Sequence, residues 1–452
     1  RGLMGRQGIG LRALLALAWP VVLSRSAQAV IGFCDALMTA PLGEESLAAA
    51  TTGAVNTFAL MILPMGVVFI VQSFASQLSG KHDLAGARRY GWYGLMLAVI
   101  AGLMVLPLRP LVSVMLSASA YEPQVQGLMA GYIEIRLLAV MAVVGFEAIG
   151  NWYGGLGNTR LHMIGSVLIM VLNFFLNYML IEGHWGMPAL GVQGAAWASV
   201  ISTWCGFGLL LLAFVLRWGC AKTEGPLHLT SREFLRMLRF GLPSGLNWFM
   251  EFAAFMIFID LIIADIGTVT VAAFMVVFQV NSVSYMPSFG LASSGAILAG
   301  QSIGAGQHDE VPRIARLTMA TAAVWQVGVG LLYLIAPAAI MMAFAPRGQE
   351  DPAIVEVGAT LLALSAAWQL FDAIGITLSE VLRAAGDTSW TMWARMISAW
   401  LLFLPLAWVS VVMFDGGGVA ALLSMVVYLG LLALAFGWRF RSGVWRSIEL
   451  TE

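Results

Sequence analysis

The stretch LFDAIGITLSEVLRAAGDT, residues 370–388, is apolar enough in its first half for a lipid bilayer, yet it carries an acid, Asp372. An earlier segment is similar, because FEAIG at 146–150 matches FDAIG at 371–375 with a shift of 225 residues. Each copy is followed a few residues later by a short polar segment, GNT at 157–159 in the first and GDT at 386–388 in the second. Such self-similarity indicates that one structural unit occurs twice in the chain.

The same spacing recurs elsewhere. Three further pairs are offset by 223 or 224 residues: Pro20 with Pro243, Pro64 with Pro287, and Gln77 with Gln301. A polar, basic stretch at 218–236 separates the two copies. The sequence therefore predicts an N-terminal six-helix lobe at 1–217, a cytoplasmic linker at 218–236 and a C-terminal six-helix lobe at 237–452.

The composition is that of a membrane protein with many spans. Of the 452 residues, 60% are hydrophobic and only 10% are charged, whereas about a quarter of the residues in a soluble globular chain are charged. The net charge of −1 argues against nucleic acid as a partner. Three widely spaced cysteines indicate neither a disulfide framework nor a zinc site. The five histidines fall near predicted helix ends or in loops, so no buried histidine relay is expected.

Apolar runs between polar breaks give the spans. About twenty apolar residues are needed to cross the hydrocarbon core as a helix, and twelve segments meet this requirement. They are 13–40, 47–77, 89–116, 126–154, 161–182, 190–217, 238–265, 269–299, 313–344, 354–383, 390–413 and 417–438.

The basic residues predict the orientation. Of 23 Lys and Arg residues, nineteen lie on the side that both termini share, including Lys222. Only Arg109 and Arg347 lie on the other side, while Arg25 and Arg136 fall within spans. The positive-inside rule then places both termini in the cytoplasm. We therefore expect a multi-pass membrane protein.

Each half has an even number of spans, so the two halves cross the membrane in the same sense. They should therefore be related by an axis along the membrane normal. The predicted fold is an all-α membrane protein with twelve transmembrane helices in two pseudo-symmetric six-helix bundles around a central cavity. Rocking of the two bundles would expose that cavity to each side in turn, which is the architecture of a transporter.

Three acids within the spans are candidates for ion coupling: Asp35, Glu251 and Asp372. An ionised acid at the bilayer centre costs about 2.5–3.5 kcal/mol on insertion scales, so such residues normally face the protein interior. Surroundings that exclude water favour the protonated form of a carboxyl group, which can then exchange a proton, and carboxylate oxygens also suit Na⁺. The alternative is that each acid pairs with an internal arginine or caps a neighbouring backbone.

Polar residues near these acids are further candidates. Asn173 and Asn177 are four residues apart and could ligate an ion beside Asp35, or form interhelical hydrogen bonds. Trp368 precedes Asp372 by one turn and could lie over a bound cation. The substrate-binding candidates are Arg25, Gln28, Glu147, Gln279 and Asn281. Arg25 either balances an acid across the cavity or is buried for structural reasons, whereas Glu134 and Arg136 have the pattern of a local pair or of side chains that extend to the membrane surface.

Three segments resemble a known family. LALAWPVVLSRSAQAVIGFCDALMTAPLG is similar to the first helix of multidrug and toxic compound extrusion (MATE) transporters, LRFGLPSGLNWFMEF to their seventh, and LFDAIGITLSEVLRAAGDT to their tenth. Glu251 together with Asp372 most resembles the bacterial NorM type. The resemblance implies antiport of Na⁺ or H⁺ against organic, often cationic, compounds.

The same resemblance assigns roles to individual residues. It places Glu251 and Asp372 in a cation site of the C-terminal lobe, where they could hold Na⁺, with Trp368 nearby. It places Asp35 in the N-terminal lobe, surrounded by Asn173, Asn177 and Ser199.

The sequence thus favours a secondary antiporter rather than an enzyme, because it has no phosphate-binding Gly-rich Lys motif, no HExxH and no GxSxG. No catalytic residue and no cofactor other than the coupling ion is expected. The expected partners are the lipid bilayer and small drug-like compounds, and the expected state is a monomer. One alternative is a flippase for lipid-linked precursors, which would want a basic cavity and has Arg25 as its support. Another is a membrane-embedded transferase.

Overall fold

The computed structural model describes residues 10–119, 121–221, 227–344 and 352–451, which are helical almost throughout and contain no strand. Lys222, Arg347 and residues 222–226 of the predicted linker lie outside these ranges. The predicted all-α class is confirmed.

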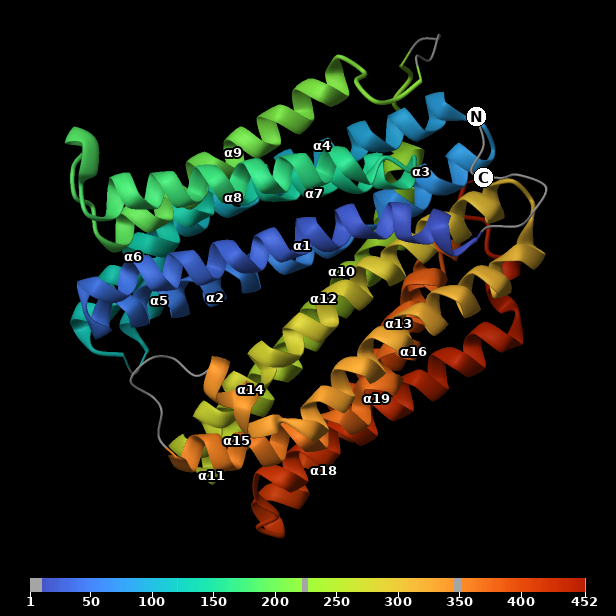
Figure 1. Ribbon diagram of the computed structural model, residues 1–452. Coiled ribbons are helices and arrows are strands. Elements are labelled where there is room, and N and C mark those ends of the chain that lie inside the picture. The colour runs from blue at the N-terminus through green and yellow to red at the C-terminus, as the bar shows by residue number, and fades with distance from the viewer. Residues whose placement is uncertain (1–9, 120, 222–226, 345–351, 452) are drawn as a thin grey trace. The chain divides into compact units, whose positions relative to one another are not determined.

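The helices follow one another along the chain with short connections (Figure 1). In the first half they are α1 (Leu11–Thr39), α2 (Glu44–Val68), α3 (Ile70–Gly80), α4 (Leu84–Val105), α5 (Arg109–Ser117), α6 (Pro123–Arg136), α7 (Val140–Gly155), α8 (Thr159–Ile181) and α9 (Val192–Val215). In the second half they are α10 (Ser231–Ile257), α11 (Ala264–Ile266), α12 (Thr268–Gly304), α13 (Val311–Ile335), α14 (Pro337–Phe344), α15 (Pro352–Ser365), α16 (Gln369–Ala385), α17 (Thr388–Met396), α18 (Leu404–Trp408) and α19 (Gly417–Ser442).

Eleven helical stretches are long and apolar enough to cross a membrane, and each coincides with one of the predicted spans. The remaining predicted span, 238–265, is also helical, since α10 continues through a π-helical turn at Phe258–Ile263 into α11. The first third of α10 is amphipathic, with Arg232, Glu233, Arg236 and Arg239. These charges lower its mean hydropathy without interrupting the helix. Twelve helical spans are therefore present.

The ninth span differs from its predicted length. The sequence predicts one helix over 313–344, but α13 ends at Ile335 and α14 begins separately at Pro337. Ala336, between them, has φ −136° and ψ 51°, which is not helical. The residue before a proline is disfavoured in the α conformation, and proline has no N–H to continue the hydrogen-bond ladder.

The internal repeat is visible as a shared irregularity. A 3-10 turn at Leu137–Ala139 separates α6 from α7, and another at Ala366–Trp368 separates α15 from α16. The matching segments FEAIG and FDAIG both lie just after these turns. Glu147 and Asp372, the acids that correspond in the repeat, thus lie in helices that start anew inside the span.

The chain forms two compact units, one of residues 23–245 and one of residues 1–22 with 246–452. Helices α1 and α10 contribute residues to both. Within the first unit α8 packs along α9 and α4 along α7, and within the second α12 packs against α13 and α16 (Figure 1). Each unit has its own apolar core, with Met129 and Tyr132 in the first and Phe258, Phe274 and Phe436 in the second.

Many large apolar side chains of the spans remain exposed, such as Leu103 at 61%, Val324 at 77% and Leu434 at 73%. In water a surface of this kind would cause aggregation. On a chain with twelve apolar spans it is the surface expected to face lipid.

Gly194 shows how closely α8 and α9 approach. A Cβ at this position would come within 2.3 Å of the carbonyl oxygen of Leu180, which is backbone and cannot turn aside. We expect Gly194→Ala to lower the free energy of unfolding by about 1–3 kcal/mol. The matched control is Gly208→Ala on the same helix, where nothing lies within 4 Å and alanine should stabilise the helix. Unfolding in detergent measures both, and equal stability of the two variants would contradict the prediction.

Candidate functional site

Asp35 lies near the end of α1, beside two asparagines of α8 that share one face because they are four residues apart. Its Oδ1 accepts a hydrogen bond from Asn177 Nδ2 at 2.6 Å, and its Oδ2 accepts one from Ser199 Oγ at 3.2 Å. Asn173 donates to Ser199 Oγ and accepts from Asn177 Nδ2, both at 3.2 Å. The structure brings together the four residues that the resemblance assigns to this cluster.

The donors around Asp35 are uncharged. Asp35 forms no ion pair with any side chain in the described ranges, so the groups in direct contact with its carboxylate are neutral hydrogen-bond donors. Asn173 and Asn177 are fully buried. Asn177 has a further feature, because its own Oδ1 is buried and accepts no hydrogen bond from the described part of the chain.

Arg25 of α1 and Glu147 of α7 form a buried ion pair. Arg25 donates to both oxygens of Glu147, at 3.0 and 3.1 Å, and Gln28 Nε2 donates to Oε1 at 3.0 Å. Asn151 donates to the backbone carbonyl of Glu147 at 2.7 Å. Arg25 thus balances an acid by direct contact, in a largely buried pair, so the structure has features of both predicted alternatives. His162 lies near the start of α8, as predicted for the histidines, and is 7% exposed, with its Nε2 3.9 Å from Glu147 Oε1.

A cavity of about 280 Å³ opens beside these groups within the unit of residues 23–245. Its apolar wall includes Phe58, Met61 and Met65, and its polar wall includes Gln28, Asn173 and Ser199. Two charged side chains also line it, Glu147 and Arg136.

The contacts of Arg136 contradict the prediction of a local pair with Glu134. It forms no ion pair with Glu134 in the described structure, and Glu134 instead uses its backbone carbonyl to accept from Arg109 Nε at 2.9 Å. The guanidinium of Arg136 lines the cavity instead.

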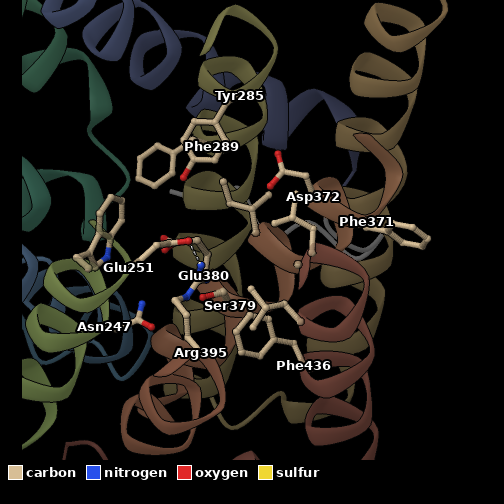
Figure 2. Close-up of a pocket in the computed structure, with 15 residues that line it drawn as sticks. Asn247, Glu251, Tyr285, Phe289, Phe371, Asp372, Ser379, Glu380, Arg395 and Phe436 are labelled. Atoms are coloured by element: carbon tan, nitrogen blue, oxygen red, sulfur yellow. Dashed lines mark hydrogen bonds and ion pairs between the residues drawn. The ribbon is translucent and has the colours of Figure 1, made fainter. Parts of the chain in front are cut away.

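Glu251 and Asp372 line one smaller cavity, of about 60 Å³, in the other unit. Figure 2 shows Glu251 on α10 with Arg395 of α17 reaching its carboxylate, and Asp372 on α16. Asp372 Oδ2 accepts from Gln326 Nε2 at 2.7 Å, and Gln326 Oε1 has no partner among the described residues. A common cavity is what a shared Na⁺ site would require, and that role remains a prediction.

The two acids differ in their partners. Glu251 forms an ion pair with Arg395, whose side chain is 13% exposed. Asp372 forms no ion pair in the described ranges and is bound by a neutral amide. The sequence allows an acid within a span either to bind a coupling ion or to pair with an internal arginine. Pairing with an arginine describes Glu251 but not Asp372.

The other predicted residues lie apart from this cavity. Trp368, in the 3-10 turn before α16, is 5% exposed, packs in the apolar core and does not line the cavity. Asn281 accepts from Gln369 Nε2 at 2.7 Å and donates to Ser365 Oγ at 3.2 Å, as an interhelical connection. Gln279 is exposed and lines neither cavity.

The sequence does not indicate the roles of four side chains at these sites. The predicted orientation places Arg395 among the cytoplasmic charges, although it lies inside the predicted span 390–413. That position inside a span is the signal that could have indicated a role at the site. Arg136 was assigned to a local pair, and Gln326 and His162 had no sequence partner to indicate their roles. Gln326 and Arg395 bind acids that lie 46 and 144 residues away in the chain, whereas His162 lies beside Glu147, which is close in sequence.

The sequence pattern of the MatE family matches residues 20–179 and 243–409, which is well over half of the chain. The chain belongs to the MatE family. One relative is the probable multidrug resistance protein NorM of Chromobacterium violaceum, 30% identical, with 87% of this chain and 85% of the relative aligned. Another is the probable multidrug resistance protein NorM of Thermotoga maritima, 27% identical, with 96% and 93% aligned.

Solved structures of MATE proteins have the same fold. A MOP superfamily transporter from Pyrococcus furiosus has a TM-score of 0.89 at 19% identity over 97% of both chains. A multidrug resistance MATE family transporter in an outward-facing conformation has a TM-score of 0.88 at 19% identity over 96% of both chains. The predicted twelve-helix, two-bundle architecture and the NorM-like assignment within the family are thus confirmed.

Proposed function

We propose that this MatE family protein is a secondary active multidrug efflux antiporter. It exports organic, often cationic, compounds by alternating access in exchange for H⁺ or Na⁺. Substrate binds from the cytoplasm, and a cation arriving from outside binds the carboxylates and displaces it outward. Each charge that moves down a potential of 100 mV releases about 2.3 kcal/mol, which can be coupled to export.

The observation that carries this proposal is the way Asp35 and Asp372 are held. Each is a carboxylate inside an apolar helix, hydrogen-bonded to neutral donors and free of any ion pair within the described ranges. A permanently paired acid would have to break its pair before binding a cation, whereas these two would not. The names of the NorM relatives support the multidrug substrate range.

The positions of the basic residues and the family support a location in the bacterial inner membrane with both termini in the cytoplasm. Arg25, the support for the flippase alternative, is bound by Glu147, so its charge is already balanced. Among the described residues, the basic group left to support a flippase is Arg136 on the cavity wall. We retain the antiporter as the proposed function.

The experiment is transport in proteoliposomes with a lipophilic cationic dye, imposing a pH gradient and a Na⁺ gradient separately. At least one of these gradients should drive the dye across the membrane, in the direction opposite to the flow of the cation. Asp35→Asn, Glu251→Gln and Asp372→Asn should weaken this transport. Full gradient-driven efflux in all three variants would show that the mechanism is wrong. Flipping of a labelled lipid-linked precursor without dye transport would favour the flippase.

A further inference from the structure

Arg136 is the charged group of the larger cavity that the proposed mechanism does not use. It lies thirteen residues after Pro123 in α6, about 20 Å along the helix axis, so it is deep in the span. Arginines near helix ends extend their charge to water, but Nε of Arg136 is buried. A guanidinium at this depth is costly unless something pairs with it.

The structure provides no such partner among the described residues. Nε of Arg136 has no hydrogen-bond acceptor, and no carboxylate forms an ion pair with the guanidinium. The charge of Asp35 acts on it from a distance, but both oxygens of Asp35 are bound by Asn177 and Ser199.

The other charged group on the cavity wall is already satisfied. Glu147 is bound by two hydrogen bonds from Arg25 and one from Gln28, so this ion pair adds no net charge. Arg136 is therefore a cation that faces the cavity with no anion in direct contact among the described residues, and the charge of Asp35 acts on it only from a distance. The opposite wall has Phe58, Met61 and Met65, and flexible methionines can adapt to apolar groups of different shape.

We propose that this cavity binds amphiphilic substrates that carry a carboxylate, with the guanidinium of Arg136 as the anchor of that carboxylate. A planar guanidinium binds both oxygens of a carboxylate in a fixed geometry, with charge-assisted hydrogen bonds. The apolar body of the substrate lies against the methionine and phenylalanine wall. The volume of about 280 Å³ suits a small aromatic compound. The physiological meaning of this site rests on the proposed transport function, but binding itself does not.

The test uses two dyes that differ at one group. Rhodamine 110 has a free carboxyl group, and rhodamine 123 is its methyl ester. Binding of each to the detergent-solubilised protein is measured by fluorescence polarisation, with no gradient applied. The wild-type protein should bind the acid more tightly than the ester, and Arg136→Gln should weaken binding of the acid by about tenfold or more while leaving the ester within about twofold.

Two further variants separate charge from folding. Arg136→Lys keeps the charge but not the paired geometry, so it should bind the acid with intermediate affinity. Arg160→Gln, at an exposed position of α8 outside the cavity, should bind both dyes as the wild type does.

The inference is overturned if the wild-type protein shows no preference for the acid or binds neither dye, or if Arg136→Gln weakens both dyes equally or neither. Transport distinguishes this failure from failure of the proposed function. A protein that binds the acid through Arg136 but moves neither dye under any gradient would support the site and contradict the antiporter.

Discussion

Replacing Asp372 with asparagine is expected to reduce gradient-driven efflux to the level of protein-free vesicles while leaving the melting temperature almost unchanged. Asparagine has nearly the same shape but cannot bind a proton and holds a metal cation poorly. Its Oδ1 can still accept the hydrogen bond that Gln326 Nε2 donates at 2.7 Å. No basic side chain in the described ranges loses an ion-pair partner. The measurement is dye transport in proteoliposomes beside thermal unfolding of the same sample.

Glu251→Gln is the matched comparison in the same cavity. It removes the ion-pair partner of Arg395, a buried cation, and an uncompensated buried charge is strongly destabilising. We therefore expect this variant to lose thermal stability as well as transport. The double variant Glu251→Gln with Arg395→Gln should recover much of the stability. If Asp372→Asn unfolds as readily as Glu251→Gln, or transports normally, the distinction between the two acids is wrong.

Arg25→Met is expected to cost about 3–5 kcal/mol of unfolding free energy, because it leaves Glu147 charged, buried and without its two strongest hydrogen bonds. The side chain of Glu147 is only 1% exposed, so water cannot replace the guanidinium. Unfolding of the detergent-solubilised protein, followed by tryptophan fluorescence, measures the loss.

The control is the double variant Arg25→Met with Glu147→Leu, in which both charges are removed together. Replacing a whole buried ion pair by apolar groups is often neutral, so most of the lost stability should return. If the single variant is as stable as the wild type, or if the double variant is less stable than the single one, Arg25 does not serve as the counter-ion of Glu147.

Much of the fold could be predicted because a bilayer requires long apolar helices, and polar breaks between them are easy to recognise. Asn173 and Asn177 could be predicted to act together, since residues four apart share a helix face, whereas the place of Ser199 beside Asp35 came from the family resemblance. The internal break of the ninth span was not, because Ala336 and Pro337 lie in an otherwise continuous apolar run.

The charged partners could not be derived from the sequence. Arg395 lies 144 residues from Glu251, and no periodicity connects them. Arg136 and Glu134 are two residues apart, a spacing that suggested a pair, but residues two apart on a helix point in different directions. Only the packing of α6 against its neighbours shows that Arg136 faces a cavity.

Asn177 and Gln326 both end in a carboxamide, and each donates a hydrogen bond from its NH₂ to an acid. The oxygen of each carboxamide accepts no hydrogen bond in the described structure. An acid that gains a proton turns from an acceptor into a donor at one of its oxygens. If the carboxamide rotates by 180° about its last side-chain bond, its carbonyl oxygen can accept a hydrogen bond from the protonated acid. The same neighbour can thus form a hydrogen bond with both the empty and the loaded acid, although for Asn177 the rotation would break the bond that its Nδ2 donates to Asn173 Oδ1.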